Sequence, residues 1–163
     1  MSETLVVTVA GPDRVDEVMA LALAASAENG FLQPDPSLLL NDVWSALTRD
    51  HGVCGVIGEP EGKAEGMIVL RLGHMSYSQL PVLEEKLVFV APEFRAAKGG
   101  RARRLAEFGK MMSDELHIPL LIGVLSNHRT EGKVKLYERM FGKPAGAFFL
   151  YGAQTGTFAV AAE

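Results

Sequence analysis

The stretch that decides the fold is Val90-Ala91-Pro92-Glu93-Phe94-Arg95-Ala96-Ala97-Lys98-Gly99-Gly100-Arg101-Ala102. It lies between an apolar run, Glu85 to Val90, and an amphipathic one, Gly100 to Leu116, and so predicts a turn from a strand into a helix. A helix N-terminus offers backbone N–H groups and about half a positive charge, and glycine lets the backbone approach an anion closely. The stretch therefore predicts a pyrophosphate site, although two glycines also begin helices for conformational reasons alone.

Other features of the sequence narrow down which class of anion this site would bind. Neither G-x-x-x-x-G-K-[ST] nor G-x-G-x-x-G occurs, which disfavours nucleotide hydrolysis and nicotinamide binding. The net charge is −4, which argues against a nucleic-acid partner. Five of the sixteen basic residues nevertheless fall within ten positions: Arg95, Lys98, Arg101, Arg103 and Arg104. A local cationic cluster on an acidic protein favours a small phosphorylated ligand.

The remaining patterns predict one α+β domain over residues 1–163, a usual size for a single core. We expect strands at 5–9, 53–58, 66–72, 85–90, 119–125, 146–151 and 157–161, and helices at 13–29, 35–47, 100–116 and 130–141. The second and third strands should form an antiparallel hairpin, and the strand, helix and buried strand from 85 to 125 a right-handed parallel crossover.

Cysteine usage and hydropathy suggest a compartment. The single cysteine, Cys54, allows no internal disulfide and no metal cluster, which fits a reducing cytoplasm. The first residues lack a basic n-region, and no apolar run approaches the ~20 residues needed to span a bilayer. We therefore expect a cytoplasmic protein with no membrane partner and no metal.

Two regions of the chain resemble the GNAT (Gcn5-related N-acetyltransferase) superfamily. In the first, the family has a strand ending in Val-x-Pro-x-Phe/Tyr-Arg before a glycine-rich turn, and Val90, Pro92, Phe94, Arg95, Gly99 and Gly100 match. In the second, a buried strand ends near Asn127 and is followed by a helix with Tyr137-Glu138 and Phe141-Gly142. The resemblance is strong from about Leu83 to Tyr151. It implies a mixed, mostly antiparallel sheet with splayed central strands, one parallel crossover and flanking helices.

The resemblance also implies acetyl-CoA as co-substrate, with its pantetheine arm hydrogen-bonded to backbone groups where the two central strands splay apart. Lys98 stands where the family pattern has glycine, so either the turn is longer or Lys98 itself faces phosphate. The expected coenzyme A contacts are Val88, Phe89, Val90, Arg95, Lys98, Gly99, Gly100, Arg101, Ala102 and Asn127. One of Arg103 and Arg104 would suit the 3′-phosphate, although both also fit a solvated helix face.

Two side chains are candidates for proton transfer. Tyr137 matches the family's acid, which protonates the departing thiolate, and its structural alternative is packing beside Val134 and Phe141. Glu85 lies on the strand that leads to the pantetheine groove and could remove a proton through water. Glu84 competes with it, because a register shift of one residue exchanges which of them faces the cleft.

The expected function is therefore transfer of an acetyl group to a small-molecule or protein amine. A non-catalytic acyl-CoA sensor or interaction module on the same scaffold is the alternative. Acceptor contacts should come from about 31–47 and 73–80, where His74 and Tyr77 could line a pocket. The apolar closing strands, 147–151 and 158–160, could pair two subunits into a homodimer.

Overall fold

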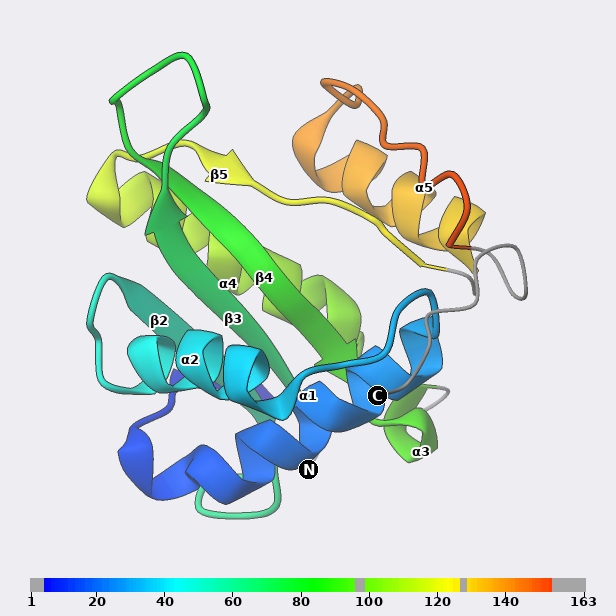
Figure 1. The fold of residues 1–163 in the computed structure, drawn as a ribbon. Coiled ribbons are helices and arrows are strands. Elements are labelled where there is room, and N and C mark those ends of the chain that lie inside the picture. The colour runs from blue at the N-terminus through cyan, green and yellow to red at the C-terminus, as the bar shows by residue number, and fades with distance from the viewer. Residues whose placement is uncertain (1–4, 96–98, 127–128, 154–163) are drawn as a thin grey trace.

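The structure is a computed structural model that describes residues 5–95, 99–126 and 129–153. Its centre is a five-stranded sheet with the strands in chain order, in which the first three pairings are antiparallel and the last is parallel (Figure 1). The strands are β1 (Val6–Val9), β2 (Gly52–Gly58), β3 (Gly66–Gly73), β4 (Val82–Val90) and β5 (Leu120–Leu121). This α+β layout with one parallel crossover confirms the expected fold class.

Helices cover both faces of the sheet. The 3-10 turn η1 (Pro12–Arg14), α1 (Val15–Asn29) and α2 (Pro36–Leu47) lie on one face, and α4 (Arg101–Leu116) lies on the other (Figure 1). The short α3 (Pro92–Arg95) follows β4, and α5 (Thr130–Phe141) lies beyond β5. The sheet is thus the middle of three layers.

Strand residues alternate between two separate cores, one on each face of the sheet. Met67 and Val69 of β3 pack in the cluster that contains Val18 of α1 and Val43 of α2. Ile68 and Leu70 pack on the opposite face, in the cluster that holds the buried side chains of α4. This period of two determines which residues of β3 and β4 point to the α2 side of the sheet and which point to the α4 side.

The ends of α1 and α2 follow from local sequence. The Asp35 side chain caps α2 by accepting hydrogen bonds from the backbone N–H groups of Ser37 (2.8 Å) and Leu38 (3.4 Å), and Pro36 occupies the first turn. Gly30 ends α1 in the left-handed conformation, with φ of 66°. Both ends lie where the sequence predicted them.

Strand β4 carries a bulge. Val69 pairs with Leu87 and Leu70 pairs with Glu85, so Lys86 is an extra residue on β4. On either side of it, Glu84 lies opposite Arg71 and Phe89 lies opposite Met67. The bulge re-aims the side chains of the middle of β4, which are the residues that matter for the candidate site.

The second half of the chain corrects two expectations. The apolar run 119–125 forms a strand only at Leu120–Leu121, because after Glu84 the neighbouring strand no longer runs beside it. Residues 146–151 form no strand, and Phe148, Phe149 and Tyr151 are largely exposed there. The expected strand at 157–161 lies outside the described residues.

Candidate active site

The glycine turn before α4 has the geometry of a helix N-terminus that no side chain caps. Gly99 and Gly100 have φ of 125° and 59°, a region that L side chains rarely adopt. A side chain at Gly99 would also meet the Leu5 side chain at 2.8 Å. Gly100 is the N-cap residue and offers no capping side chain, so the first turn of α4 presents its N–H groups without that partner. The turn therefore suits an anion.

Two of the basic side chains at this turn hold the turn itself. Arg104 donates from Nε to the carbonyl of Gly99 (2.7 Å) and from Nη1 to the carbonyl of Leu5 (2.8 Å). Arg101 is buried and donates to both carboxylate oxygens of Glu65, at 3.0 and 3.3 Å. Their guanidinium groups are thus committed to protein acceptors, which the sequence did not predict. The role expected for Arg101 in cofactor binding stays a prediction that rests on its place in the first helical turn.

Arg95 connects α3 to the end of β4 and to α1. Its Nε donates to the carbonyl of Val90 (2.9 Å), and its Nη2 pairs with Glu28 of α1 at 2.7 Å. The guanidinium lies over the Phe89 ring, 5.1 Å from its centroid. Arg95 therefore fixes the last residues of β4, and its direct contact with a cofactor stays a prediction.

The gap beside β4 is the main feature of the site. Strand β4 pairs with β5 only at Leu83 and Glu84, opposite Leu120 and Leu121. Beyond them the chain after β5 leaves β4, as Figure 1 shows, and in the described part of the chain no strand pairs with that edge of residues 85–90. The backbone there can bind an extended ligand in the way that a sheet edge binds an added strand.

Glu85 of β4 and Tyr137 of α5 lie close enough for the charge of Glu85 to act on the Tyr137 hydroxyl. Burial raises the pKa of Glu85 to about 7, against the smaller opposing effects of a hydrogen bond from the Gly123 backbone N–H and of the Lys86 ammonium. Burial also raises the pKa of Tyr137 above its usual range, and the negative charge of Glu85 adds to that rise. A carboxyl that titrates near neutrality beside a tyrosine that stays protonated is an arrangement suited to proton transfer.

Tyr137 is oriented by its own helix. It lies one turn before Phe141 on α5, and the two rings meet edge to face with centroids 5.7 Å apart. The packing expected from sequence is therefore present together with the proximity to Glu85. The edge-to-face contact orients the ring, and the charge of Glu85 acts on its hydroxyl.

The other expected contacts are only partly described. Lys98 and Asn127 lie outside the described residues. Ala102 is exposed in the first turn of α4, next to the glycine turn. The side chains of Val88, Phe89 and Val90 pack into the two cores, so any contact they make with a cofactor is through the backbone. These assignments stay predictions.

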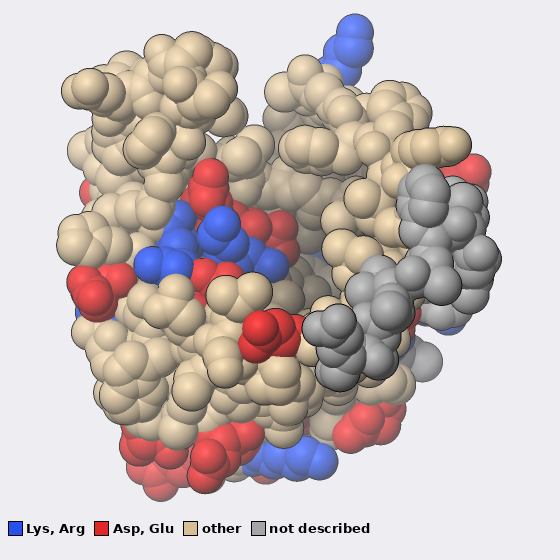
Figure 2. All heavy atoms as spheres, viewed as in Figure 1, with Lys and Arg blue, Asp and Glu red and all other residues tan. Residues whose placement is uncertain are grey.

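A recess on the α2 side of the sheet holds charges of both signs. Figure 2 shows basic and acidic side chains gathered in it over β3 and β4. Arg71 of β3 pairs with Asp42 of α2 at 2.7 Å, and Lys86 pairs with Glu84 at 3.0 Å. Arg71 and Lys86 were not predicted from the sequence, and Asp42 was predicted only as part of the acceptor segment 31–47. The available signal was Arg71, the one charged residue in an otherwise apolar strand.

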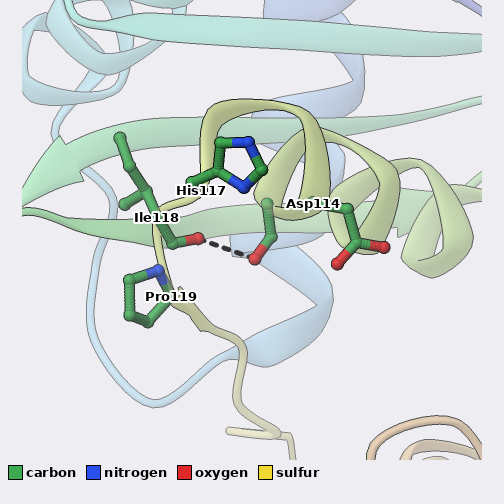
Figure 3. Close-up of a pocket in the computed structure, with 5 residues that line it drawn as sticks. Asp114, His117, Ile118 and Pro119 are labelled. Carbon is green, nitrogen blue, oxygen red and sulfur yellow. Dashed lines mark hydrogen bonds between the residues drawn. The ribbon is translucent and has the colours of Figure 1, made fainter.

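A second hollow lies at the C-terminal end of α4, opposite to the end that carries the glycine turn. It is a wide open pocket of about 500 Å³ lined by Ser113, Asp114, His117, Ile118 and Pro119 (Figure 3). The Ser113 hydroxyl donates to the Ile118 carbonyl at 2.6 Å, and His117 closes the helix in the left-handed conformation. These contacts are those of an ordinary helix end. Neither Glu85 nor Tyr137 lines this pocket.

Several solved structures with the same fold are acetyltransferases. One is AAC(6')-Iy in complex with the bisubstrate analogue CoA-S-monomethyl-acetylneamine, with 16% identity, a TM-score of 0.68, and coverage of 91% of this chain and 97% of that one. Another is a ribosomal-protein-alanine N-acetyltransferase from Brucella melitensis, with 14% identity, a TM-score of 0.63, and coverage of 90% and 96%. A third is an aminoglycoside acetyltransferase from an uncultured soil metagenomic sample in complex with trehalose, with 14% identity, a TM-score of 0.63, and coverage of 99% of both chains.

The chain thus has the fold of the GNAT acetyltransferases. No family model and no curated protein matches its sequence. Within the described residues, no helix is long and apolar enough to cross a membrane, and no group of three or more His, Cys, Asp or Glu side chains could hold a metal ion.

Proposed function

We propose that the protein is an acetyl-CoA-dependent N-acetyltransferase that moves an acetyl group directly to a primary amine of a small molecule or a protein. The observation that carries the proposal is that Glu85, whose pKa burial raises, and Tyr137 interact electrostatically beside the unpaired edge of β4. In the same fold, one of the similar structures is in complex with a CoA bisubstrate analogue. Among the described residues, the gap beside β4 combines an unpaired strand edge with titratable side chains suited to proton transfer.

The residues present fit coenzyme A. Gly99 and Gly100 leave the first turn of α4 uncapped by side chains, which suits the pyrophosphate. Since Arg101 and Arg104 are committed to protein acceptors, the backbone N–H groups of this turn are the expected phosphate ligands. The unpaired edge of residues 85–90 suits the pantetheine arm. Bound acetyl-CoA would supply an activated thioester.

Glu85 and Tyr137 then divide the proton transfers. Above pH 7 the Glu85 carboxylate is the major form and can take a proton from the acceptor ammonium, directly or through water, which leaves the amine neutral and nucleophilic. Tyr137 stays protonated through neutral pH, because burial and the nearby carboxylate both oppose its ionisation. It can therefore donate its proton to the departing sulfur.

The cellular setting of the enzyme is proposed to be the cytoplasm. Cys54 is buried as a free thiol, and burial raises its pKa to about 12. A thiol of this kind is unreactive and forms no disulfide within the chain, which fits a reducing compartment without depending on it.

The test measures acetyl-CoA binding by calorimetry and amine-dependent thiol release with a panel of amines. Tyr137→Phe should lower kcat about 10²- to 10⁴-fold, as expected for loss of a general acid, while the Kd for acetyl-CoA stays within about twofold. The wild-type kcat/KM should rise with pH and level off above about 7, where Glu85 is deprotonated. A protein that does not bind acetyl-CoA would refute the proposal. Tight binding without turnover on any amine would instead establish the acyl-CoA sensor.

A further inference from the structure

The recess on the α2 side holds the charged residues nearest in the chain to Glu85. Glu84 and Lys86 flank it, and Arg71 lies opposite Glu84 across the β3/β4 ladder. A side chain at Gly73 would meet the Glu84 carboxylate at 2.8 Å, so this carboxylate lies over β3, beside Arg71. The four charges of the recess, from Asp42, Arg71, Glu84 and Lys86, consist of two cations and two anions. A ligand in this recess meets both signs.

Arg71 is incompletely paired. Its Nη1 donates to Asp42 at 2.7 Å, whereas its buried Nε has no hydrogen-bond partner among the described residues. A buried donor without an acceptor is costly, so it marks a place where an acceptor is expected. The edge formed by Nε and Nη2 is the edge of a guanidinium that takes a carboxylate through two parallel hydrogen bonds. About a quarter of the side chain remains exposed to the recess, at 27%.

We propose that the amine acceptor carries a carboxylate close to its amine, as an α-amino acid does, and that Arg71 binds this carboxylate. The proposal rests on the proposed function, because it takes the molecule bound in the recess to be the amine acceptor. In the absence of acceptor, Asp42 and Glu84 partly neutralise the two cations. A zwitterionic acceptor matches these four charges: its carboxylate would bind Arg71, and its ammonium would lie beside Asp42 and Glu84.

This substrate class differs from that of an aminoglycoside, which is the acceptor type named for two of the similar structures. A polycation would bring several positive charges onto a surface that contains Arg71 and Lys86. Asp42 and Glu84 balance these two cations, so what disfavours a polycation is that it offers Arg71 no acceptor. The recess therefore selects for an acceptor with a negative group.

The experiment compares each of four amino acids (leucine, phenylalanine, glutamate and lysine) with its own carboxamide. Binding to the CoA-loaded protein is measured by calorimetry and acetylation by thiol release with acetyl-CoA. The carboxamide makes the neighbouring amine less basic, so more of it is neutral at pH 7. A preference for the acid therefore runs against intrinsic reactivity.

At least one acid should bind, and be acetylated with kcat/KM, about tenfold or more better than its amide, as expected for a charge-assisted pair. Arg71→Met should remove that ratio, and Arg71→Lys should restore part of it. Asp42→Asn is the matched control, because it breaks the same ion pair but keeps the guanidinium, and it should retain the ratio. A merely structural ion pair would make Arg71→Met and Asp42→Asn behave alike.

The two readouts separate the two proposals. Arg71-dependent binding of an acid without acetylation would support the carboxylate site and refute acetyl transfer. Equal binding and turnover of acid and amide in all four pairs would overturn the carboxylate site and leave the transferase standing. Efficient acetylation of the aminoglycoside tobramycin with no acid preference would also overturn it.

Discussion

Replacing Glu85 by glutamine should make the folded protein more stable than the wild type, by an amount that grows with pH. Burial holds the pKa of this carboxyl at about 7 instead of the usual 4.5. Between these two values the folded protein keeps a proton that the unfolded chain has released, so the unfolding free energy of the wild type falls as pH rises. Glutamine has no charge to bury and escapes this loss.

The size of the effect follows from the pKa difference. At about 1.36 kcal/mol per pKa unit, the wild type should lose about 2 to 3 kcal/mol relative to Glu85→Gln between pH 5 and pH 8. Partial exposure of the Glu85 side chain moves the expectation towards the smaller figure. The loss begins above about pH 4.5 and is complete above about pH 7.

Urea denaturation at a series of pH values measures this difference, with the fluorescence of the single tryptophan, Trp44, as one probe and circular dichroism as another. Glu84→Gln is the matched control, since it removes the adjacent carboxyl but keeps Glu85, and it should retain the wild-type fall. If the unfolding free energies of wild type and Glu85→Gln changed in parallel from pH 5 to pH 8, the burial argument for Glu85 would be wrong.

Two further substitutions test the glycine turn and its surroundings. Gly99→Ala should destabilise the protein by about 1–3 kcal/mol and weaken acetyl-CoA binding, because alanine disfavours φ of 125° and its Cβ would meet Leu5. Gly132→Ala on α5, where a side chain meets open space, should instead be neutral or stabilising by up to about 1 kcal/mol; equal effects of the two in urea denaturation would contradict the strain. Arg101→Met should cost about 3 kcal/mol, because it leaves the partly buried Glu65 carboxylate without its guanidinium partner. Adding Glu65→Met should recover part of that loss, and a double variant no more stable than the single one would argue against the pairing.

The helices could largely be predicted from the sequence, because the signals that begin and end them are local. Asp35-Pro36 fixes the start of α2, and Gly30 ends α1, by contacts within a few residues. The amphipathic pattern of 100–116 likewise predicted α4 almost to the residue. Capping and periodicity need no knowledge of distant parts of the chain.

The strands near the site were less predictable, because a strand requires a partner as well as a suitable composition. Residues 119–125 are apolar throughout, yet only Leu120–Leu121 pair, because β4 diverges from the chain that follows. Residues 146–151 are equally apolar, yet they form no strand and are largely exposed in the structure. Composition indicates what can be buried, and tertiary geometry decides what is.

The sequence by itself determined the glycine turn before α4, the helix that follows it, and Tyr137 and Glu85 as candidates. Only the tertiary structure distinguishes the surroundings of Glu85 and Glu84: Glu85 accepts a hydrogen bond from the Gly123 backbone and its charge acts on Tyr137, whereas Glu84 pairs with Lys86. It also showed that Arg101 and Arg104 donate to protein acceptors. The physical reason is common to both: hydrogen bonding, burial and charge pairing at these side chains depend on residues far apart in the chain.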